Sequence, residues 1–216
     1  MPSNLRAYWN PITADNFAKI CEHGYDTVAM FGVEKTSVAA LEVYEPFLCL
    51  AEEYGLKAMV GSQPEILANS GWPIHLTWSV NDFETAYGDA YDVLEADSRV
   101  VGYYTESACL AGTQWLRAKT KKILTYDFYG QPIPSGDPPD FADVIALNDE
   151  VVFEVFNLVI APQCVSDVAY LYALNPKLKV GVWDQTLNLW SYDYAFYWYN
   201  GTFGTPPQFH TVRNSN

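Results

Sequence analysis

The sequence predicts an α/β protein, a small (β/α)8 TIM barrel whose eighth helix is missing. Short β-branched or aromatic stretches alternate with segments of helical spacing along the chain. The 216 residues are 50% apolar, enough for one full core, so residues 1–216 are expected to form a single barrel domain. An open doubly wound sheet is the alternative, but no strand is followed by a GxGxxG or GxxxxGK[ST] turn for phosphate.

The stretch 99–127 carries this alternation most clearly. Residues 100–105 are β-branched and aromatic and too short for a helix, whereas 108–119 has apolar residues at helical spacing. Residues 123–126 are the next expected strand. A strand, a helix and a strand in so few residues predict a parallel βαβ unit, whose ligands bind beyond the carboxyl ends of the strands.

The rest of the chain repeats the pattern. A first helix is expected to start at Thr13 or Asp15, and a long helix over 37–54 contains Pro46, which predicts a kink. Residues 61–81 are rich in Pro, Gly and Trp and are expected to loop over the strand ends. The other expected strands are 5–9, 27–31, 57–60, 158–161, 179–183 and 208–212, and the other expected helices are 82–94, 141–156, 166–174 and 190–203.

Charge narrows the class of partner. Twelve basic side chains oppose 26 acidic ones, a net charge of −14, which repels nucleic-acid phosphates and anionic membranes. No run approaches the ~20 apolar residues of a membrane span. We therefore expect no nucleic-acid partner and no membrane partner, and a neutral or cationic ligand is favoured.

The cellular compartment and the state of the four cysteines depend on each other. Residues 1–4 lack the apolar segment of a signal peptide, so the protein is expected to stay inside the cell or, if a leader precedes this sequence, to be extracellular. The cysteines show no CxxC spacing and are expected to be core thiols. In a secreted chain, the alternative is pairing of Cys21 with Cys49 and of Cys109 with Cys164.

The sequence lacks the residues that several kinds of catalytic site require. His23, His75 and His210 have no metal-ligand spacing, so no metal and no other cofactor is expected. A GxSxG elbow for a nucleophilic serine is absent, and no cysteine has a basic neighbour that would activate it. Carboxylates, amides and aromatic side chains remain as the candidate functional groups.

Because the strand ends of a barrel meet on one face, residues far apart in sequence are expected to ring one pocket. Glu106, Asp127 and Asp184 follow three strands and are the candidate catalytic carboxylates, since a pair of carboxyl groups performs glycoside hydrolysis. By the two-residue period, Val180, Val182 and Asp184 share one face, expected to be the barrel interior. The structural alternatives are a carboxylate at a helix N-terminus for Glu106 and a turn or cap for Asp184.

Aromatic residues are numerous, with seven Trp and 16 Tyr, and their flat faces stack on sugar rings. Packing between helices and barrel is the alternative, which we expect for Trp115 and for the cluster at 194–199. The expected substrate-binding residues are Tyr8, Trp9, Asn10, Gln63, Tyr126, Gln163, Trp183 and Trp190.

The segment 98–106, SRVVGYYTE, is followed by a helix containing WLR and a strand containing KIL. It resembles the fourth-strand region of (β/α)8-barrel glycoside hydrolases, in many of which a Gly-aromatic strand ends in Asp-Glu or Asn-Glu. The resemblance covers residues 97–127. It implies that the chain binds carbohydrate and that Glu106 is the general acid.

Two departures from that family keep other functions open. Thr105 stands where those hydrolases usually carry Asn or Asp, and Asp184 stands where the retaining clan carries Glu. One alternative is a non-catalytic carbohydrate-binding or structural surface protein built on a degenerate hydrolase barrel, and another is a lyase or isomerase acting on a small molecule. For a hydrolase, we expect a neutral or amino-sugar polysaccharide, because a polyanion would meet like charge at the cleft.

Overall fold

The computed structural model describes residues 6–8, 13–22, 25–30, 42, 44–62, 78–106, 110–129, 140–155, 161–185 and 194–198. Within them, strands and helices alternate from the first strand to the seventh. The strands are β1 (Arg6–Tyr8), β2 (Thr27–Met30), β3 (Lys57–Ser62), β4 (Val100–Glu106), β5 (Ile123–Tyr129), β6 (Glu150–Val155), β7 (Lys179–Gln185) and β8 (Tyr194–Trp198). The helices are α1 (Ala14–Glu22), α2 (Tyr44–Glu53), α4 (Val80–Ala96), α5 (Leu110–Lys119), α6 (Phe141–Leu147) and α7 (Ala161–Leu174).

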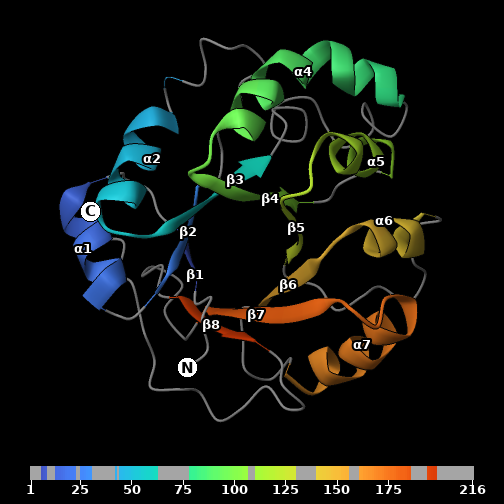
Figure 1. The fold of residues 1–216 in the computed structure, drawn as a ribbon. Coiled ribbons are helices and arrows are strands. Elements are labelled where there is room, and N and C mark those ends of the chain that lie inside the picture. The colour runs from blue at the N-terminus through green and yellow to red at the C-terminus, as the bar shows by residue number, and fades with distance from the viewer. Residues whose placement is uncertain are drawn as a thin grey trace.

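The described strands form one sheet in sequence order, and every pairing from β1 to β7 is parallel. β8 pairs antiparallel with β7 and also approaches β1. Figure 1 shows the strands curling around the middle of the molecule, with the helices outside them. The described residues thus form an α/β fold, a curled half-barrel of parallel strands with six helices. The expected full (β/α)8 barrel is not confirmed, since no described pairing joins β8 to β1.

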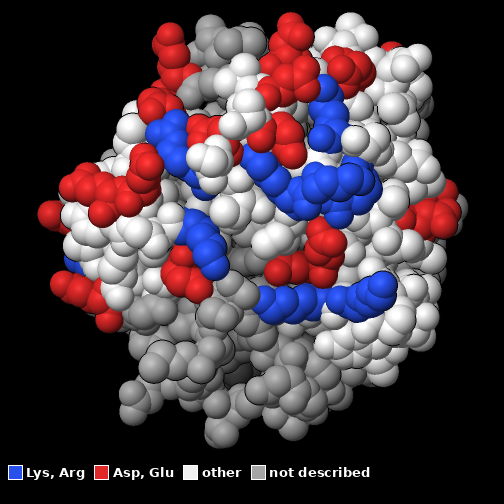
Figure 2. All heavy atoms as spheres, in the orientation of Figure 1, with Lys and Arg blue, Asp and Glu red and all other residues white. Residues whose placement is uncertain are grey.

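Every Lys and Arg in the described ranges belongs to one end of the sheet. Lys57 and Lys179 are the first residues of β3 and β7, and Arg99 directly precedes β4. The others lie at the start of β1, within two residues before a strand, or in the last turn of α1 or α5. Figure 2 shows Lys and Arg side chains gathered around the middle of one face. The carboxyl ends of the strands lie at the opposite end.

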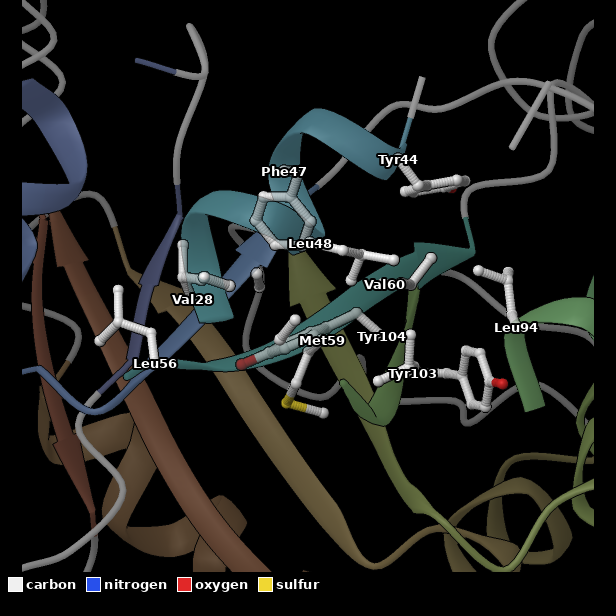
Figure 3. Packing of buried hydrophobic residues seen from close by; sticks show 14 of the residues in the cluster. Val28, Tyr44, Phe47, Leu48, Leu56, Met59, Val60, Leu94, Tyr103 and Tyr104 are labelled. Atoms are coloured by element: carbon white, nitrogen blue, oxygen red, sulfur yellow. The ribbon is translucent and has the colours of Figure 1, made fainter. Parts of the chain in front are cut away.

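Two hydrophobic clusters fix the helices to the sheet. The larger surrounds β2, β3 and β4 and includes Phe47 and Leu48 of α2 and Leu94 of α4. Figure 3 shows Phe47, Leu48 and Val60 on one side of β3 and Met59 on the other. The smaller cluster packs α6 and α7 against β5, β6 and β7. Alternate residues of each strand therefore face the helices or the interior of the curl.

The expected strands before residue 130 and the expected strand at 179–183 are confirmed, with small shifts at their ends. The expected strand at 158–161 is wrong at residue 161, and residues 158–160 lie outside the described residues. Ala161 is the first residue of α7, and the sixth strand lies earlier, at β6. Consequently the expected helix over 141–156 is also too long.

Local chemistry explains why α6 stops early. The side-chain amide of Asn148 donates a hydrogen bond of 2.8 Å to the carbonyl oxygen of Val144, and the Asn148 backbone is extended. Residues 151–153, Val-Val-Phe, are β-branched and aromatic, and such residues fit a pleated strand better than a helix. The apolar spacing of this segment suits both structures, and the strand pairing with β5 and β7 decides between them.

The end of the chain also differs from the prediction. Residues 194–198, expected within a helix over 190–203, form β8 and pair with β7, Trp198 opposite Gly181. Their sequence, YAFYW, is almost entirely aromatic, a composition that favours strands. The expected eighth strand at 208–212 lies outside the described residues.

Helix α2 is shorter than the helix expected over 37–54. It begins at Tyr44, so Pro46 lies in its first turn, where a backbone N–H has no partner within the helix. The expected kink is therefore not required. The helix is followed by Gly55, whose φ of 67° is a left-handed conformation that favours glycine.

Helix α4, with 17 residues, is the longest helix in the described ranges. It begins with a capping box: Ser79 Oγ accepts a hydrogen bond from the Asp82 backbone N–H, and the Asp82 carboxylate accepts one from the Ser79 backbone N–H. None of the described helices combines the length and the apolar character needed to cross a membrane.

Candidate functional site

The carboxyl ends of β4, β5 and β7 carry the three candidate catalytic residues. Glu106 is the last residue of β4, and its Cα pairs with that of Asp127 on β5. Asp184 pairs with Val155 of β6 and with Ala195 of β8. Glu106 and Asp127 are therefore direct neighbours on adjacent parallel strands, whereas Asp184 lies two strands from Asp127.

Alternation along β4 decides which side of the sheet each position occupies. The Tyr103 hydroxyl donates a hydrogen bond of 3.1 Å to Glu95 Oε2 of α4, so Tyr103 faces the helices. Gly102 faces the interior, where an added Cβ would come within 2.5 Å of Met59 Cε. The two-residue period then places position 106 on the interior side, with Gly102.

Alternation along β5 decides in the same way which side of the sheet position 127 occupies. Tyr126 faces α6, and the centroid of its ring lies 6.4 Å from that of Phe141. Thr125 faces the interior, where its Oγ1 donates a hydrogen bond of 2.8 Å to Glu150 Oε2. Position 127 shares the side of Thr125. Tyr126, expected to bind substrate, is 9% exposed and belongs to the smaller cluster between sheet and helices.

Asp184 occupies the other side of its strand. Val180 belongs to the cluster that packs against α6 and α7, so positions 182 and 184 are helix-facing positions and Trp183 is an interior position. The expectation that Val180 faces the interior is therefore wrong, whereas the side chains of Val182 and Asp184 lie outside the described residues. The reason for the wrong expectation is that both faces of a parallel sheet are buried, so a valine in such a strand does not indicate whether it faces the helices or the interior.

Other expected substrate-binding residues fall in several places. Tyr8 ends β1, and Gln163, expected at the end of a sixth strand, lies in α7. Trp115 is 5% exposed, which confirms the expectation that it is a core residue. Trp9, Asn10, Gln63 and Trp190 lie outside the described residues, as do the side chains of Tyr8, Glu106, Asp127, Gln163, Trp183 and Asp184.

Glu150 and Glu154 were not expected near the site, because the sequence of their segment predicts a helix over 141–156. Glu150, the first residue of β6, is 5% exposed, and its Oε1 lies 3.8 Å from Lys179 Nζ. Position 154 pairs with Trp183 and shares the interior side with Glu150 by alternation. Assigning the segment EVVFEV to a strand would have placed both glutamates on the same side of the sheet.

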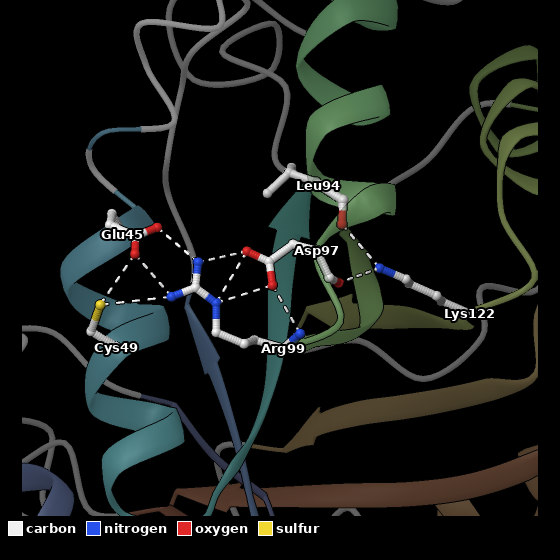
Figure 4. Close-up of polar contacts among 6 residues, drawn as sticks. All are labelled: Glu45, Cys49, Leu94, Asp97, Arg99 and Lys122. Atoms are coloured by element: carbon white, nitrogen blue, oxygen red, sulfur yellow. Dashed lines mark hydrogen bonds and ion pairs between the residues drawn. The ribbon is translucent and has the colours of Figure 1, made fainter.

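The opposite end of the sheet holds an ion-pair network, drawn in Figure 4. Arg99 Nη2 lies 2.8 Å from Glu45 Oε2 and 2.7 Å from Asp97 Oδ2. Hydrogen bonds from this guanidinium lower the pKa of both carboxyl groups. Lys122 Nζ donates to the carbonyl oxygens of Leu94 and Asp97 at 2.9 and 2.8 Å, and burial lowers its pKa. The network joins α2 and α4 to the strand starts and has a structural role.

Metal binding and disulfide bonding both require particular side chains to lie close together in the described part of the chain. No cluster of three or more His, Cys, Asp and Glu side chains there is arranged to hold a metal ion. Cys21 and Cys49 are both free thiols, so the alternative of a bond between them is wrong. Cys49 is exposed and its Sγ lies 3.2 Å from Glu45 Oε1, so it is not a core thiol. Cys109 and the side chain of Cys164 lie outside the described residues.

No protein family and no curated protein matches the chain. The xylanase and alpha-amylase inhibitor protein from Scadoxus multiflorus is similar in structure, with 13% identity over 84% of this chain and 79% of its own and a TM-score of 0.49. A GH5_18 protein from Streptomyces cattleya, in complex with GlcNAc, has 14% identity over 71% of this chain and 47% of its own, with a TM-score of 0.48. The type I 3-dehydroquinate dehydratase from Clostridium difficile has 8% identity over 79% of this chain and 69% of its own, with a TM-score of 0.47. Likenesses this distant assign neither a family nor a function.

Proposed function

We propose that this chain is a glycoside hydrolase whose two working carboxylates are Glu106 and Asp127. The observation that supports the proposal is the Cα pairing of these residues at the carboxyl ends of β4 and β5. Strand alternation gives both of them interior positions, and both lie near the carboxyl ends of their strands, beyond which a parallel α/β fold binds its ligands. We include in the proposal that β8 completes a closed barrel around this site.

The pairing favours a retaining mechanism. Adjacent strands lie ~4.8 Å apart, so carboxyl groups on paired positions are expected ~5 Å apart, the spacing of retaining enzymes, whereas inversion needs ~6.5 to 9.5 Å. Glu106 donates its proton to the leaving oxygen while the Asp127 carboxylate attacks the anomeric carbon. Water, deprotonated by Glu106, then releases the sugar from Asp127.

The proposed substrate is a neutral or amino-sugar polysaccharide. The chain carries a net charge of −14, and every described Lys and Arg belongs to the end of the sheet away from Glu106 and Asp127. A polyanion approaching the carboxyl ends of the strands would therefore meet like charge. The interior position of Trp183, beside the proposed site, suits stacking on a sugar ring.

A non-catalytic carbohydrate-binding protein is the second candidate. Thr105 precedes Glu106 where hydrolases of this kind usually carry Asn or Asp, and this departure favours a degenerate site. Binding without turnover would distinguish this candidate from the hydrolase.

A panel of labelled neutral, amino-sugar and acidic glycans tests both candidates. We expect the wild type to bind and cleave a neutral or amino-sugar chain, and Glu106→Gln to lower turnover by ~10² or more while binding persists. Glu53→Gln, an exposed glutamate of α2, is the matched control and is expected to cleave normally. Binding without cleavage by the wild type supports the second candidate, and neither binding nor cleavage contradicts both.

A further inference from the structure

A row of polar residues, three of them buried, lies one step below the proposed carboxylate pair. Four residues pair in register across β4, β5, β6 and β7, in the order Tyr104, Thr125, Glu150 and Lys179. Tyr104 and Thr125 are fully buried, Glu150 is 5% exposed, and the side chain of Lys179 is 37% exposed. Asp127 is two residues after Thr125, so this row is the layer directly beneath it.

The charges in this row are those of Glu150 and Lys179. Glu150 Oε2 accepts the hydrogen bond from Thr125, and Glu150 Oε1 lies 3.8 Å from Lys179 Nζ. A buried carboxylate requires such partners, because water does not solvate it. While both charges are present they largely cancel; loss of Lys179 leaves the Glu150 charge in the interior of the sheet without this partner, and loss of Glu150 leaves the Lys179 charge at the partly exposed start of β7.

That net charge would lie close to Asp127. Position 127 pairs with Val152, which is two residues after Glu150 on β6. Strands ~4.8 Å apart and a rise of ~3.3 Å per residue give a Cα separation of ~8 Å between Asp127 and Glu150. Charges at this range in a buried region are weakly screened by salt.

We propose that Glu150 and Lys179 form a positioning pair that sets the pH range in which Asp127 works as an ionised carboxylate. The inference rests on the proposed function, in which Asp127 is the nucleophile. With Glu150 neutralised, the remaining Lys179 charge favours ionised Asp127, whereas with Lys179 neutralised, the remaining Glu150 charge opposes it.

Other titratable residues occupy the same side of the sheet, and each stays constant in the comparison. They are Tyr104 and Glu106 on β4, Tyr129 on β5 and Glu154 on β6, and on β7 the charged interior position is Lys179 itself. A shift that changes sign between the two substitutions therefore reports on the Glu150 and Lys179 charges alone.

The test compares Glu150→Gln and Lys179→Met in the pH profile of kcat/KM on the glycan that the wild type cleaves. We expect the acidic limb to move down by about one pH unit in Glu150→Gln and up by about one unit in Lys179→Met. Lys177→Met, the same charge loss at an exposed position two residues earlier, is the matched control and leaves the limb in place. Limbs that stay fixed or move in the same direction in both variants overturn the proposal.

A direct titration separates this inference from the proposed function. The carboxyl carbon of Asp127, assigned by its loss in Asp127→Asn, is followed by NMR in the wild type and both variants. Opposite shifts uphold the pair even if no glycan is cleaved, in which case only the hydrolase proposal fails. Cleavage with an unmoved Asp127 titration overturns the pair and leaves the hydrolase proposal standing. Lys179→Gln replaces Lys179→Met if circular dichroism shows that the latter is unfolded.

Discussion

Replacing Gly102 by alanine tests how closely β3, β4 and β5 pack on the interior side. The new Cβ would lie 2.5 Å from Met59 Cε, 2.7 Å from the Ile123 carbonyl oxygen and 2.9 Å from Ile123 Cβ. The Met59 methyl group ends a flexible side chain and can move, but the Ile123 carbonyl belongs to the backbone of β5. Because strands must shift to admit the methyl group, we expect the free energy of unfolding to fall by about 2 kcal/mol, within the range of overpacked cores.

Urea unfolding followed by circular dichroism measures this loss. With a slope of about 2 kcal/mol/M, the midpoint should fall by about 1 M. Gly88→Ala is the matched control: its Cβ would lie 2.8 Å from Glu84 Oε1, so the Glu84 side chain must move and loosen its contacts with Trp115 and Lys119, a loss that is offset by the helix preference of alanine, about 1 kcal/mol. A Gly102→Ala midpoint equal to that of the wild type, or no lower than that of Gly88→Ala, would refute the close packing of these strands.

Three further predictions concern described contacts. Arg99 lowers the pKa of Asp97, so this pair stabilises the fold fully at a pH above the ordinary Asp pKa of ~3.9. The stabilisation is lost as the pH falls through the lower pKa that Asp97 has in the folded protein. The urea midpoints of the wild type and Arg99→Met should therefore differ at pH 6 and converge toward pH 2. Trp115→Phe removes the 2.6 Å hydrogen bond from Trp115 Nε1 to Glu84 Oε2 and should lower the free energy of unfolding by about 1 kcal/mol, and an unchanged midpoint would contradict this. Iodoacetamide should label exposed Cys49 faster than half-buried Cys21 at pH 9, as peptide mass spectrometry can check, and faster labelling of Cys21 would count against the described exposures.

Most of the strands follow from the sequence because their signals are local. β4 and β5 are short β-branched and aromatic runs that do not carry the helical spacing of their neighbours. β6 and β8 were misassigned because apolar runs such as 151–153 and 194–198 satisfy helical and strand patterns equally. Their structure is decided by pairing with distant strands, which a local pattern does not contain.

The candidate site was predictable in part for the same reason. Parallel strands bring their carboxyl ends together, so Glu106 and Asp127 were expected to line one pocket, and the Cα atoms of these two residues pair. The side on which Asp184 lies depends on which valines of β7 contact the helices, and Val180 does so. Glu150 was missed because recognising it as an interior residue requires the strand assignment of β6.

Turnover by Asp127→Asn and by Asp184→Asn provides the most direct test of the proposed site. The two variants make the same chemical change at the ends of β5 and β7, on an interior position and on a helix-facing position. With folding verified, we predict that Asp127→Asn lowers kcat/KM for the cleaved glycan by ~10² or more, whereas Asp184→Asn stays within ~10-fold of the wild type. Equal losses in the two variants, or a greater loss in Asp184→Asn, would contradict the assignment of Glu106 and Asp127 as the working pair.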